Sequence, residues 1–191
     1  KVIGRDIYVN GSFDFKKLKK TLKILDNQLD PELLIDIGAN IGTICIPAIR
    51  RGLFNSAIAF EPEPLNFSLL NTNISLNSLS SKIVTHNIAL GDKEDSFAEL
   101  ELSEFNYGDN RIRTSNSKPT KNKTIKVASK KMDDKIENIN PKSTLIWMDT
   151  QGYEGFILKG ARRILEKNVP LVLEFWPYGM SLSDSYTHMK N

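Results

Sequence analysis

The sequence is poor in cysteine, histidine and tryptophan, and it has no long apolar run. It holds one cysteine, Cys45, with two histidines and two tryptophans, among 191 residues. A single cysteine excludes an internal disulfide, so the chain fits a reducing compartment, and we expect a cytoplasmic protein. No stretch approaches the roughly 20 consecutive apolar residues of a membrane-spanning helix. Because no His, Cys and Asp residues stand at metal-ligand spacing, we expect no metal site.

A strong excess of either charge is also lacking. The 26 lysines and arginines and the 23 aspartates and glutamates leave a net charge of +3. Basic residues do gather between Lys16 and Lys23 and again between Arg111 and Lys135. Such stretches are usually solvated surface, and the overall balance does not require a nucleic-acid partner. The pattern leaves the oligomeric state open.

Short apolar runs alternate with stretches of helical periodicity along most of the chain. The runs typical of buried strands are Leu33–Ile37, Ser56–Phe60, Ile83–Leu90, Thr144–Asp149 and Val169–Phe175. Apolar residues at helical spacing predict helices over Phe15–Leu29, Ile41–Arg51, Pro64–Ile74 and Tyr153–Leu165. This alternation predicts an α/β fold with a mainly parallel sheet flanked by crossover helices.

One crossover has a different pattern. Apolar residues from Phe97 to Leu102, and again at Ile125 and Val127, predict two antiparallel strands around the basic loop. We therefore expect residues 96–131 to form an inserted hairpin and loop. Residues 1–30 would be an N-terminal helical extension of a single domain over 1–191. After Phe175 the strand pattern is weak, so strands that would complete a seven-stranded sheet are not apparent.

The turn after the first predicted strand reads DIGANIG, from Asp36 to Gly42. Glycines in a strand-to-helix turn let a ligand lie against the backbone. Asn40 stands where a dinucleotide-binding turn has glycine, and no lysine follows as in a P-loop, so an NAD-dependent reductase is disfavoured. Glu61 follows the second strand, 25 residues after Asp36, near the ~20-residue spacing of a ribose-binding acid. A carboxylate repels phosphate, so a ligand with ribose but no phosphate fits best: S-adenosylmethionine.

Further motifs occur in order along the chain. They read AFEPEPLNFSLLNTNISLN, NIALGD, NYGDNRI and MDTQGYEGFILKGARRIL. Together with DIGANIG they resemble the FkbM family of S-adenosylmethionine-dependent methyltransferases, which implies a Rossmann-like class I fold. The resemblance covers about Leu33–Phe175. Its most particular motif is D-x-x-G-Y/A-E followed by L-x-G-A.

The resemblance implies a cofactor site at the carboxyl ends of the strands. The residues that would line it are Asp36, Gly38, Asn40 and Gly42 at the methionine end, Glu61 at the ribose, Pro62 and Ala89 at the adenine, and Asp149 with Gly152 and Glu154 beside the methyl group. The family commonly has an acid where this chain has Gln151. That difference removes one charge from the site.

Methyl transfer to a hydroxyl requires aligned reactants and a group that removes the hydroxyl proton. The candidate bases are carboxylates near the ends of the buried strands: Asp149 first, then Glu154 and Glu174, with His188 as a further candidate. Donors and an aromatic face that could bind the acceptor are Asn110, Arg111 and Trp176.

The leading hypothesis is O-methylation of a hydroxyl on a sugar, glycan or other small metabolite. A tRNA-base methyltransferase is the alternative, because DIGANIG also resembles the opening of such enzymes. Those that methylate amino groups often carry Asn-Pro-Pro-Tyr where this chain has MDTQG. A third hypothesis is a non-catalytic S-adenosylmethionine-binding or interaction protein, which the non-acidic Gln151 keeps open.

Overall fold

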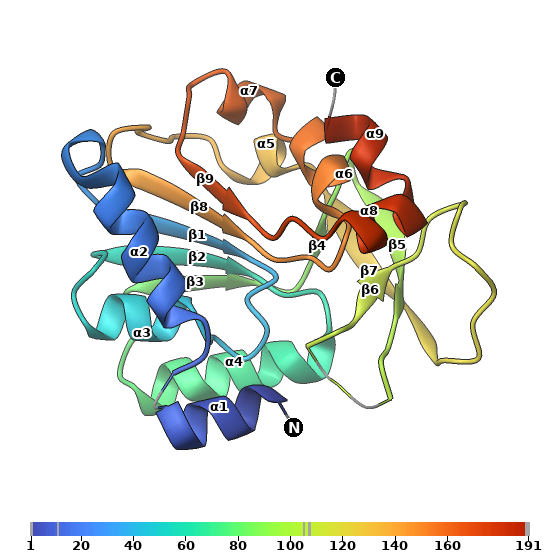
Figure 1. Ribbon diagram of the computed structural model, residues 1–191, viewed down its shortest axis with the longest axis horizontal. Helices are drawn as coiled ribbons and strands as arrows, with labels where there is room; N and C mark the ends of the chain where they lie inside the picture. The colour runs from blue at the N-terminus through green and yellow to red at the C-terminus, as the bar shows by residue number, and fades with distance from the viewer. Residues whose placement is uncertain (1, 11, 105, 107, 190–191) are drawn as a thin grey trace.

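The computed structural model describes residues 2–10, 12–104, 106 and 108–189. A five-stranded parallel sheet lies at its centre, in the order β3-β2-β1-β8-β9 (Figure 1). Its strands are β1 (Leu33–Ile37), β2 (Ser56–Phe60), β3 (Ile83–His86), β8 (Thr144–Met148) and β9 (Leu171–Leu173). The chain builds outward from β1 to β3 on one side and from β8 to β9 on the other. The strand order therefore reverses between β1 and β8.

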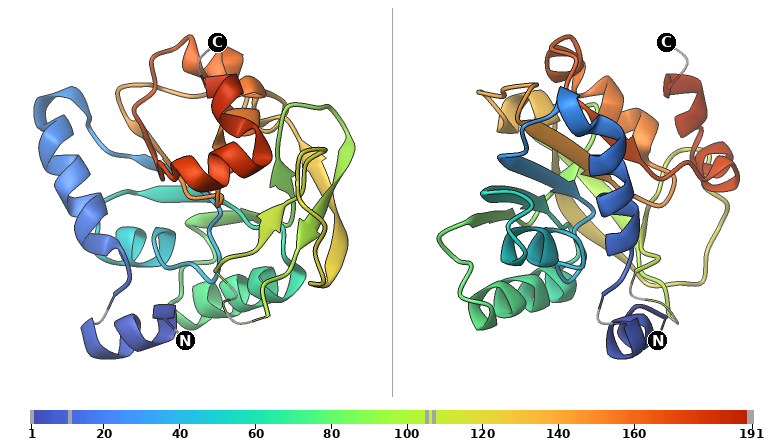
Figure 2. Two further views of the ribbon diagram at one scale, coloured as in Figure 1. Left: turned by 45° about the vertical axis from the view of Figure 1, so that its right-hand side comes forward. Right: turned by 60° about the vertical axis from the view of Figure 1, so that its left-hand side comes forward.

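Helices cover both faces of this sheet (Figures 1 and 2). The helices are α2 (Phe15–Leu25), α3 (Cys45–Arg50) and α4 (Pro64–Leu76) on one face, and α5 (Met132–Lys135), α6 (Glu154–Lys159) and α7 (Arg162–Leu165) on the other. Successive side chains of a strand point to opposite faces. Leu34 accordingly packs with the first set and Ile35 with the second. A strand buried on both faces is mostly apolar, as in LLIDI and TLIWM, where Asp36 and Thr144 are the polar members.

A second sheet replaces the crossover helix between β3 and β8. Its order is β4-β7-β5-β6, with strands β4 (Ala89–Leu90), β5 (Ser96–Glu101), β6 (Arg111–Ile112) and β7 (Thr124–Lys130). Strands β5 and β7 pair antiparallel from Ser96↔Ser129 to Glu101↔Thr124. The predicted α/β architecture with an inserted antiparallel hairpin is confirmed. That residues 1–191 make one domain stays a prediction.

Several predicted elements have different bounds. The predicted helix over Phe15–Leu29 ends at Leu25 and is followed by a 3-10 helix, and the predicted strand over Val169–Phe175 is reduced to Leu171–Leu173.

The helix expected from Ile41 begins only at Cys45, because Asn40 and Gly42 adopt left-handed backbone angles, with φ of 52° and 92°. The helix expected over Tyr153–Leu165 divides at Gly160. There the carbonyl oxygen of Gly160 accepts a hydrogen bond from the amide of Asp133, outside the helix.

The third predicted strand, Ile83–Leu90, also divides. Strand β3 ends at His86, and β4 pairs with β7 in the second sheet. Between them the Asn87 side chain donates hydrogen bonds to the carbonyl oxygens of Glu61 and Pro62, at 2.9 and 3.1 Å. This amide holds the chain at the point where it leaves one sheet for the other.

The remaining elements lie toward the chain ends. They are α1 (Val2–Asn10), the 3-10 helix η1 (Asp26–Gln28), α8 (Pro177–Ser183) and α9 (Ser185–Met189). The segment after Phe175, where the sequence shows little strand pattern, is thus helical. In the part of the chain that the structure describes, no helix has both the length and the apolar character needed to cross a membrane.

Helix α9 packs directly on the backbone of α6. The amide of Gly155 donates a 2.6 Å hydrogen bond to Ser185 Oγ. A Cβ atom at position 155 would lie 1.9 Å from the Ser185 carbonyl oxygen. The close approach of these two helices therefore depends on the absence of a side chain at Gly155.

We predict that Gly155→Ala lowers the free energy of unfolding by about 1–3 kcal/mol, because the added methyl group forces α6 and α9 apart. Urea denaturation monitored by circular dichroism measures the change. Gly4→Ala is the matched control, since a Cβ at Gly4 meets no atom within 4 Å. Equal stability of the two variants would show that the α6–α9 contact is not tightly packed.

Candidate active site at the carboxyl edge of the sheet

The register of the parallel strands determines which residues lie together at the site. Ile37 of β1 lies opposite Phe60 of β2 and Met148 of β8. The residue after each of these strand ends is Gly38, Glu61 and Asp149. The backbone ladder continues one step further, with Gly38 N bonded to the Phe60 oxygen and Asp149 N to the Ile37 oxygen, both at 3.0 Å. Residues far apart in the sequence thus form one row at the sheet edge.

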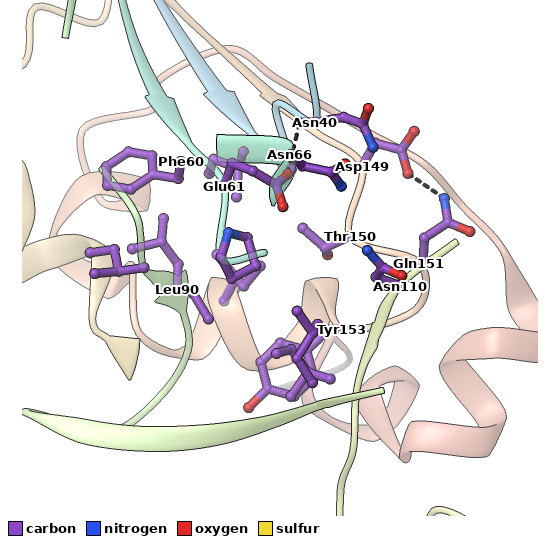
Figure 3. Close-up of a pocket in the computed structure, with 18 of the residues that line it drawn as sticks. Asn40, Phe60, Glu61, Asn66, Leu90, Asn110, Asp149, Thr150, Gln151 and Tyr153 are labelled. Atoms are coloured by element: carbon purple, nitrogen blue, oxygen red, sulfur yellow. Dashed lines mark hydrogen bonds between the residues drawn. The ribbon is translucent and has the colours of Figure 1, made fainter. Parts of the chain in front are cut away.

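The row borders a cavity at the point where the strand order reverses, as ligand sites do in open α/β sheets. Figure 3 shows Glu61 on one side of this cavity, Asp149 and Gln151 on another, and Tyr153 opposite them. Apolar side chains form much of the wall: Ile37, Phe60, Ile88, Leu90, Leu100, Ile112 and Ile157. Polar groups are few, and they converge from both sheets. This is the usual composition of a small-molecule site.

The turn after β1 brings backbone to the cavity. Gly38 has a φ of 82°, and a Cβ there would lie 1.9 Å from the Asp149 carbonyl oxygen. Only glycine allows β1 and β8 to approach this closely at their ends. Asn40 also lines the cavity, and its Oδ1 accepts a 2.9 Å hydrogen bond from the Ile41 amide. That side-chain bond stabilises the left-handed conformation of Asn40.

Glu61 is fixed by two backbone amides. Its Oε2 accepts from Asn40 N at 2.8 Å and its Oε1 from Glu63 N at 2.9 Å. Burial outweighs these bonds and raises the pKa of the Glu61 carboxyl to about 7. The Asn66 side chain is a further hydrogen-bond partner of this carboxyl. A carboxylate has about four lone-pair sites, so it can still accept a hydroxyl donor, and its fixed position makes it a rigid acceptor.

Two residues that were predicted to contact the cofactor do not line the cavity. Asp36 is buried and does not line the cavity; its Oδ2 accepts a 3.0 Å bond from Cys45 N at the start of α3. Burial raises the pKa of Asp36 to about 6. Gly42 faces the opposite side, where a Cβ would meet Ile46 at 2.4 Å. Contact of either residue with a cofactor stays a prediction.

Pro62, Ala89 and Asn110 do line the cavity with Gly38, Asn40, Glu61 and Asp149. Ala89 reaches it from β4. Asn110, just before β6, brings an amide from the inserted sheet, and its Oδ1 accepts a 2.9 Å bond from Ser103 N. Most of the predicted cofactor residues and one predicted acceptor-binding residue are therefore brought together.

Glu154 has a different surrounding. It is fully buried at the start of α6 and does not line the cavity. Its Oε1 accepts hydrogen bonds from Thr150 N, Thr150 Oγ1 and Gly152 N, at 3.0, 3.0 and 3.3 Å. Burial raises the pKa of Glu154. This carboxyl braces the 150–152 turn from beneath.

Glu174 follows β9 and continues the row of strand ends, with its amide bonded to the Met148 oxygen at 2.9 Å. It lines an adjoining cavity beside α2, and Asp149 lines both cavities. Burial and the nearby Asp149 carboxylate raise the pKa of Glu174 to about 7. Asp149 therefore lies between the first cavity and the Glu174 carboxyl.

The other predicted acceptor residues form an outer rim. The Arg111 guanidinium lies 4.5 Å from the centre of the Trp176 ring, and it bonds Asp109 Oδ1 at 2.6 Å. Trp176 packs at a tilt against Tyr178, with ring centres 5.8 Å apart. Their part in acceptor binding stays a prediction.

Sequence reasoning missed several cavity residues. Asn66, Thr150 and Tyr153 all line the cavity, and burial raises the pKa of Tyr153 to about 12. Gln151, which the sequence placed near the site, lines it as well. Asn66 sits in the first turn of α4, which Glu63 caps by accepting from Leu65 N and Asn66 N. The E-P-E-P-L-N sequence, an acid before a first-turn proline, is the signal that could have placed it.

Comparisons with known proteins were made for this chain. The model of the methyltransferase FkbM domain matches residues 36–187. Methyltransferase 1 of Beauveria bassiana (strain ARSEF 2860) is 32% identical over 69 residues, which are 36% of this chain and 27% of that protein.

Among solved structures, the methyltransferase FkbM of Methylobacillus flagellatus KT matches with a TM-score of 0.57 at 21% identity, covering 84% of this chain and 37% of that chain. This likeness supports the fold. An RNA methyltransferase from Salinibacter ruber in complex with S-adenosyl-L-homocysteine matches at 12% identity with a TM-score of 0.44, over 83% of this chain and 73% of that one.

The chain spans well under half of the B. bassiana and M. flagellatus relatives. The fold is the Rossmann-like fold of methyltransferases, with the strand order reversing between β1 and β8. Because the family model covers most of the sequence, including both the turn at Gly38 and the segment around Asp149, this chain belongs to the methyltransferase FkbM domain family.

Proposed function

We propose that this chain is an S-adenosylmethionine-dependent methyltransferase that acts on a hydroxyl group of a sugar, glycan or other small metabolite. The observation that carries the proposal is the row of strand ends. It brings the glycine turn, the Glu61 carboxylate and the Asp149 carboxylate to one cavity. Family membership supports methyl transfer, and the acceptor class rests on the chemistry of the site.

The residues present fit S-adenosylmethionine. Glu61 would hold the ribose hydroxyls, the Gly38–Asn40 turn would hold the methionine part, and Ile88–Leu90 would border the adenine. When bound, the cofactor supplies an electrophilic methyl group on a sulfonium. The chain itself supplies an apolar wall that includes Phe60, Leu90 and Ile157 and that would pack against the adenine.

A hydroxyl acceptor is favoured by the acids near the methyl end. An alcohol is a weak nucleophile until its proton is removed. Asp149 lines the cavity. We therefore assign proton removal to a carboxylate, with Asp149 in direct contact with the acceptor and Glu154 stabilising the 150–152 turn.

Nucleic acid is disfavoured by the ion pairs of the inserted sheet. Arg113 contacts Glu101 at 2.7 Å and Glu99 at 3.4 Å. Lys130 and Lys131 each contact an acid at 2.8 Å. Cations already paired with acids attract phosphate less strongly than solvated ones. This favours a small acceptor over a tRNA.

We predict that Glu61→Ala weakens binding of S-adenosylmethionine or S-adenosylhomocysteine by roughly 10- to 150-fold, equivalent to about 1.5–3 kcal/mol, because a charge-assisted contact to the ribose is lost. Isothermal titration calorimetry measures the affinity. Glu63→Ala is the matched control: it removes a helix cap at a cost of about 1 kcal/mol of stability, and affinity should stay within a few-fold. Unchanged affinity in folded Glu61→Ala would remove Glu61 from the cofactor site.

We predict that Asp149→Asn lowers the methyl-transfer rate ~10²- to 10⁴-fold while cofactor affinity changes only a few-fold, since the amide keeps the shape but cannot take a proton. Single-turnover rates at saturating cofactor measure this, with an acceptor found by screening extracts with labelled cofactor. Glu154→Gln should instead lower stability with little loss of rate. A near wild-type rate in Asp149→Asn would shift the assignment to Glu174.

A further inference from the structure

Gln151 joins two carboxylates that belong to different strands. Its Nε2 lies 2.7 Å from Asp149 Oδ1 and 3.0 Å from Glu174 Oε2. An amide nitrogen carries two hydrogens, one for each of these contacts. The bridge spans the ends of β8 and β9. Figure 3 shows the hydrogen bond between Gln151 and Asp149 at the edge of the cavity.

The backbone holds Gln151 in place for this bridge. Its φ is 55° and that of Gly152 is 98°. A left-handed conformation is uncommon for a residue with a side chain and costs free energy unless the surroundings impose it. Here Glu154 bonds the turn from below, and a Cβ at Gly152 would lie 2.6 Å from the backbone of Gly179 in α8. The turn is thus fixed on two sides.

Charged groups of α2, α6 and β1 face the pair. Asp36 of β1 and Asp149 repel each other. Lys17 of α2 attracts both Asp149 and Glu174, and is itself bonded to Asp14 Oδ2 at 2.8 Å. Glu154 lies behind the pair and repels Glu174. Two carboxylates held close together resist ionising at the same time, so one proton tends to remain on the pair.

We propose that Gln151 is a positioning residue that holds Asp149 and Glu174 as one proton-sharing unit, in which the ionised carboxylate accepts the proton of the acceptor hydroxyl. This rests on the proposed function. An acid at position 151 would add a third negative charge and could not donate to the other two. The amide is therefore suited to the pair, and its presence does not indicate a lost activity.

The proton balance is simple. The acceptor O–H bond breaks and its proton joins a carboxylate oxygen of the unit. The acceptor oxygen takes the methyl group as the carbon–sulfur bond breaks, and the sulfur leaves with the bonding electrons as a neutral thioether. Gln151 keeps its two donor bonds throughout, so the proton can rest on either carboxyl without a change of geometry.

The test is a pH titration of the chain alone, without cofactor or acceptor. Carbon-13 NMR of labelled aspartate and glutamate carboxyls is followed from acid to mildly alkaline pH, with Glu174→Gln used to assign the Glu174 signal. We expect Glu174 to titrate near pH 7, in keeping with its raised pKa.

Two variants at position 151 test the bridge. In Gln151→Ala both carboxylates lose a hydrogen-bond donor that favours their ionised form, so the midpoint of Glu174 should rise. In Gln151→Glu a third like charge should move the highest midpoint upward. Gln28→Glu, which adds the same charge at an exposed position of η1, should leave the midpoints unchanged.

Titration of wild-type Glu174 at about pH 4.3 would overturn the proposal. Midpoints that do not move in Gln151→Ala would also overturn it. Neither result depends on methyl transfer, and a failure of the proposed function would appear separately, as absent cofactor binding. A purely structural role of Gln151 would change stability and leave the midpoints in place.

Discussion

The in-register hydrogen-bond ladder of the parallel sheet is the constraint on which the site depends. Each strand ends at the same level, so the residues that follow β1, β2, β8 and β9 stand side by side. A shift of one residue in any strand would turn its side chains to the other face. It would also move an acid out of the row. The apolar runs that bury the sheet therefore also set the spacing of its polar edge.

The second requirement is a rigid turn after β8. Residues 150–152 are held by the buried Glu154 carboxyl on one side and by α8 on the other. Ser183 of α8 also donates its hydroxyl to the Gly152 carbonyl oxygen. The C-terminal helices thus contribute to the site without lining the main cavity. These helices occupy the space into which the turn could otherwise move.

The sequence was sufficient to predict the sheet and the position of the cavity. Apolar runs marked the strands of the first sheet, most clearly the central strands β1 and β8, because burial on both faces leaves little choice of residue. Glu61 and Gly38 could be placed because each directly follows a strand. Side-chain direction was harder to predict. Asp36 carries the same motif signal, yet it faces the start of α3, since alternation along β1 sets its direction.

Gln151 shows a second limit of sequence reasoning. Taken alone, Gln151 stands where the family commonly has an acid, and the loss of that acid suggests weaker catalysis. Its partner Glu174 lies 23 residues away on another strand, and no local pattern links the two. The division of the predicted strand over Ile83–Leu90 could not be predicted for a similar reason. Its second half pairs with β7, which comes later in the chain.

The separate origins of the two walls of the cavity bear on how such proteins diversify. The row of strand ends belongs to the first sheet, whereas Asn110 and Ile112 come from the inserted one. The inserted sheet is joined to β3 through two residues of β4 that pair with β7. Under the proposed function, mutations in the insertion can alter acceptor choice while the ladder that holds the cofactor residues stays intact. Related chains can in this way bind new acceptors without changes to the part of the pocket that the first sheet forms.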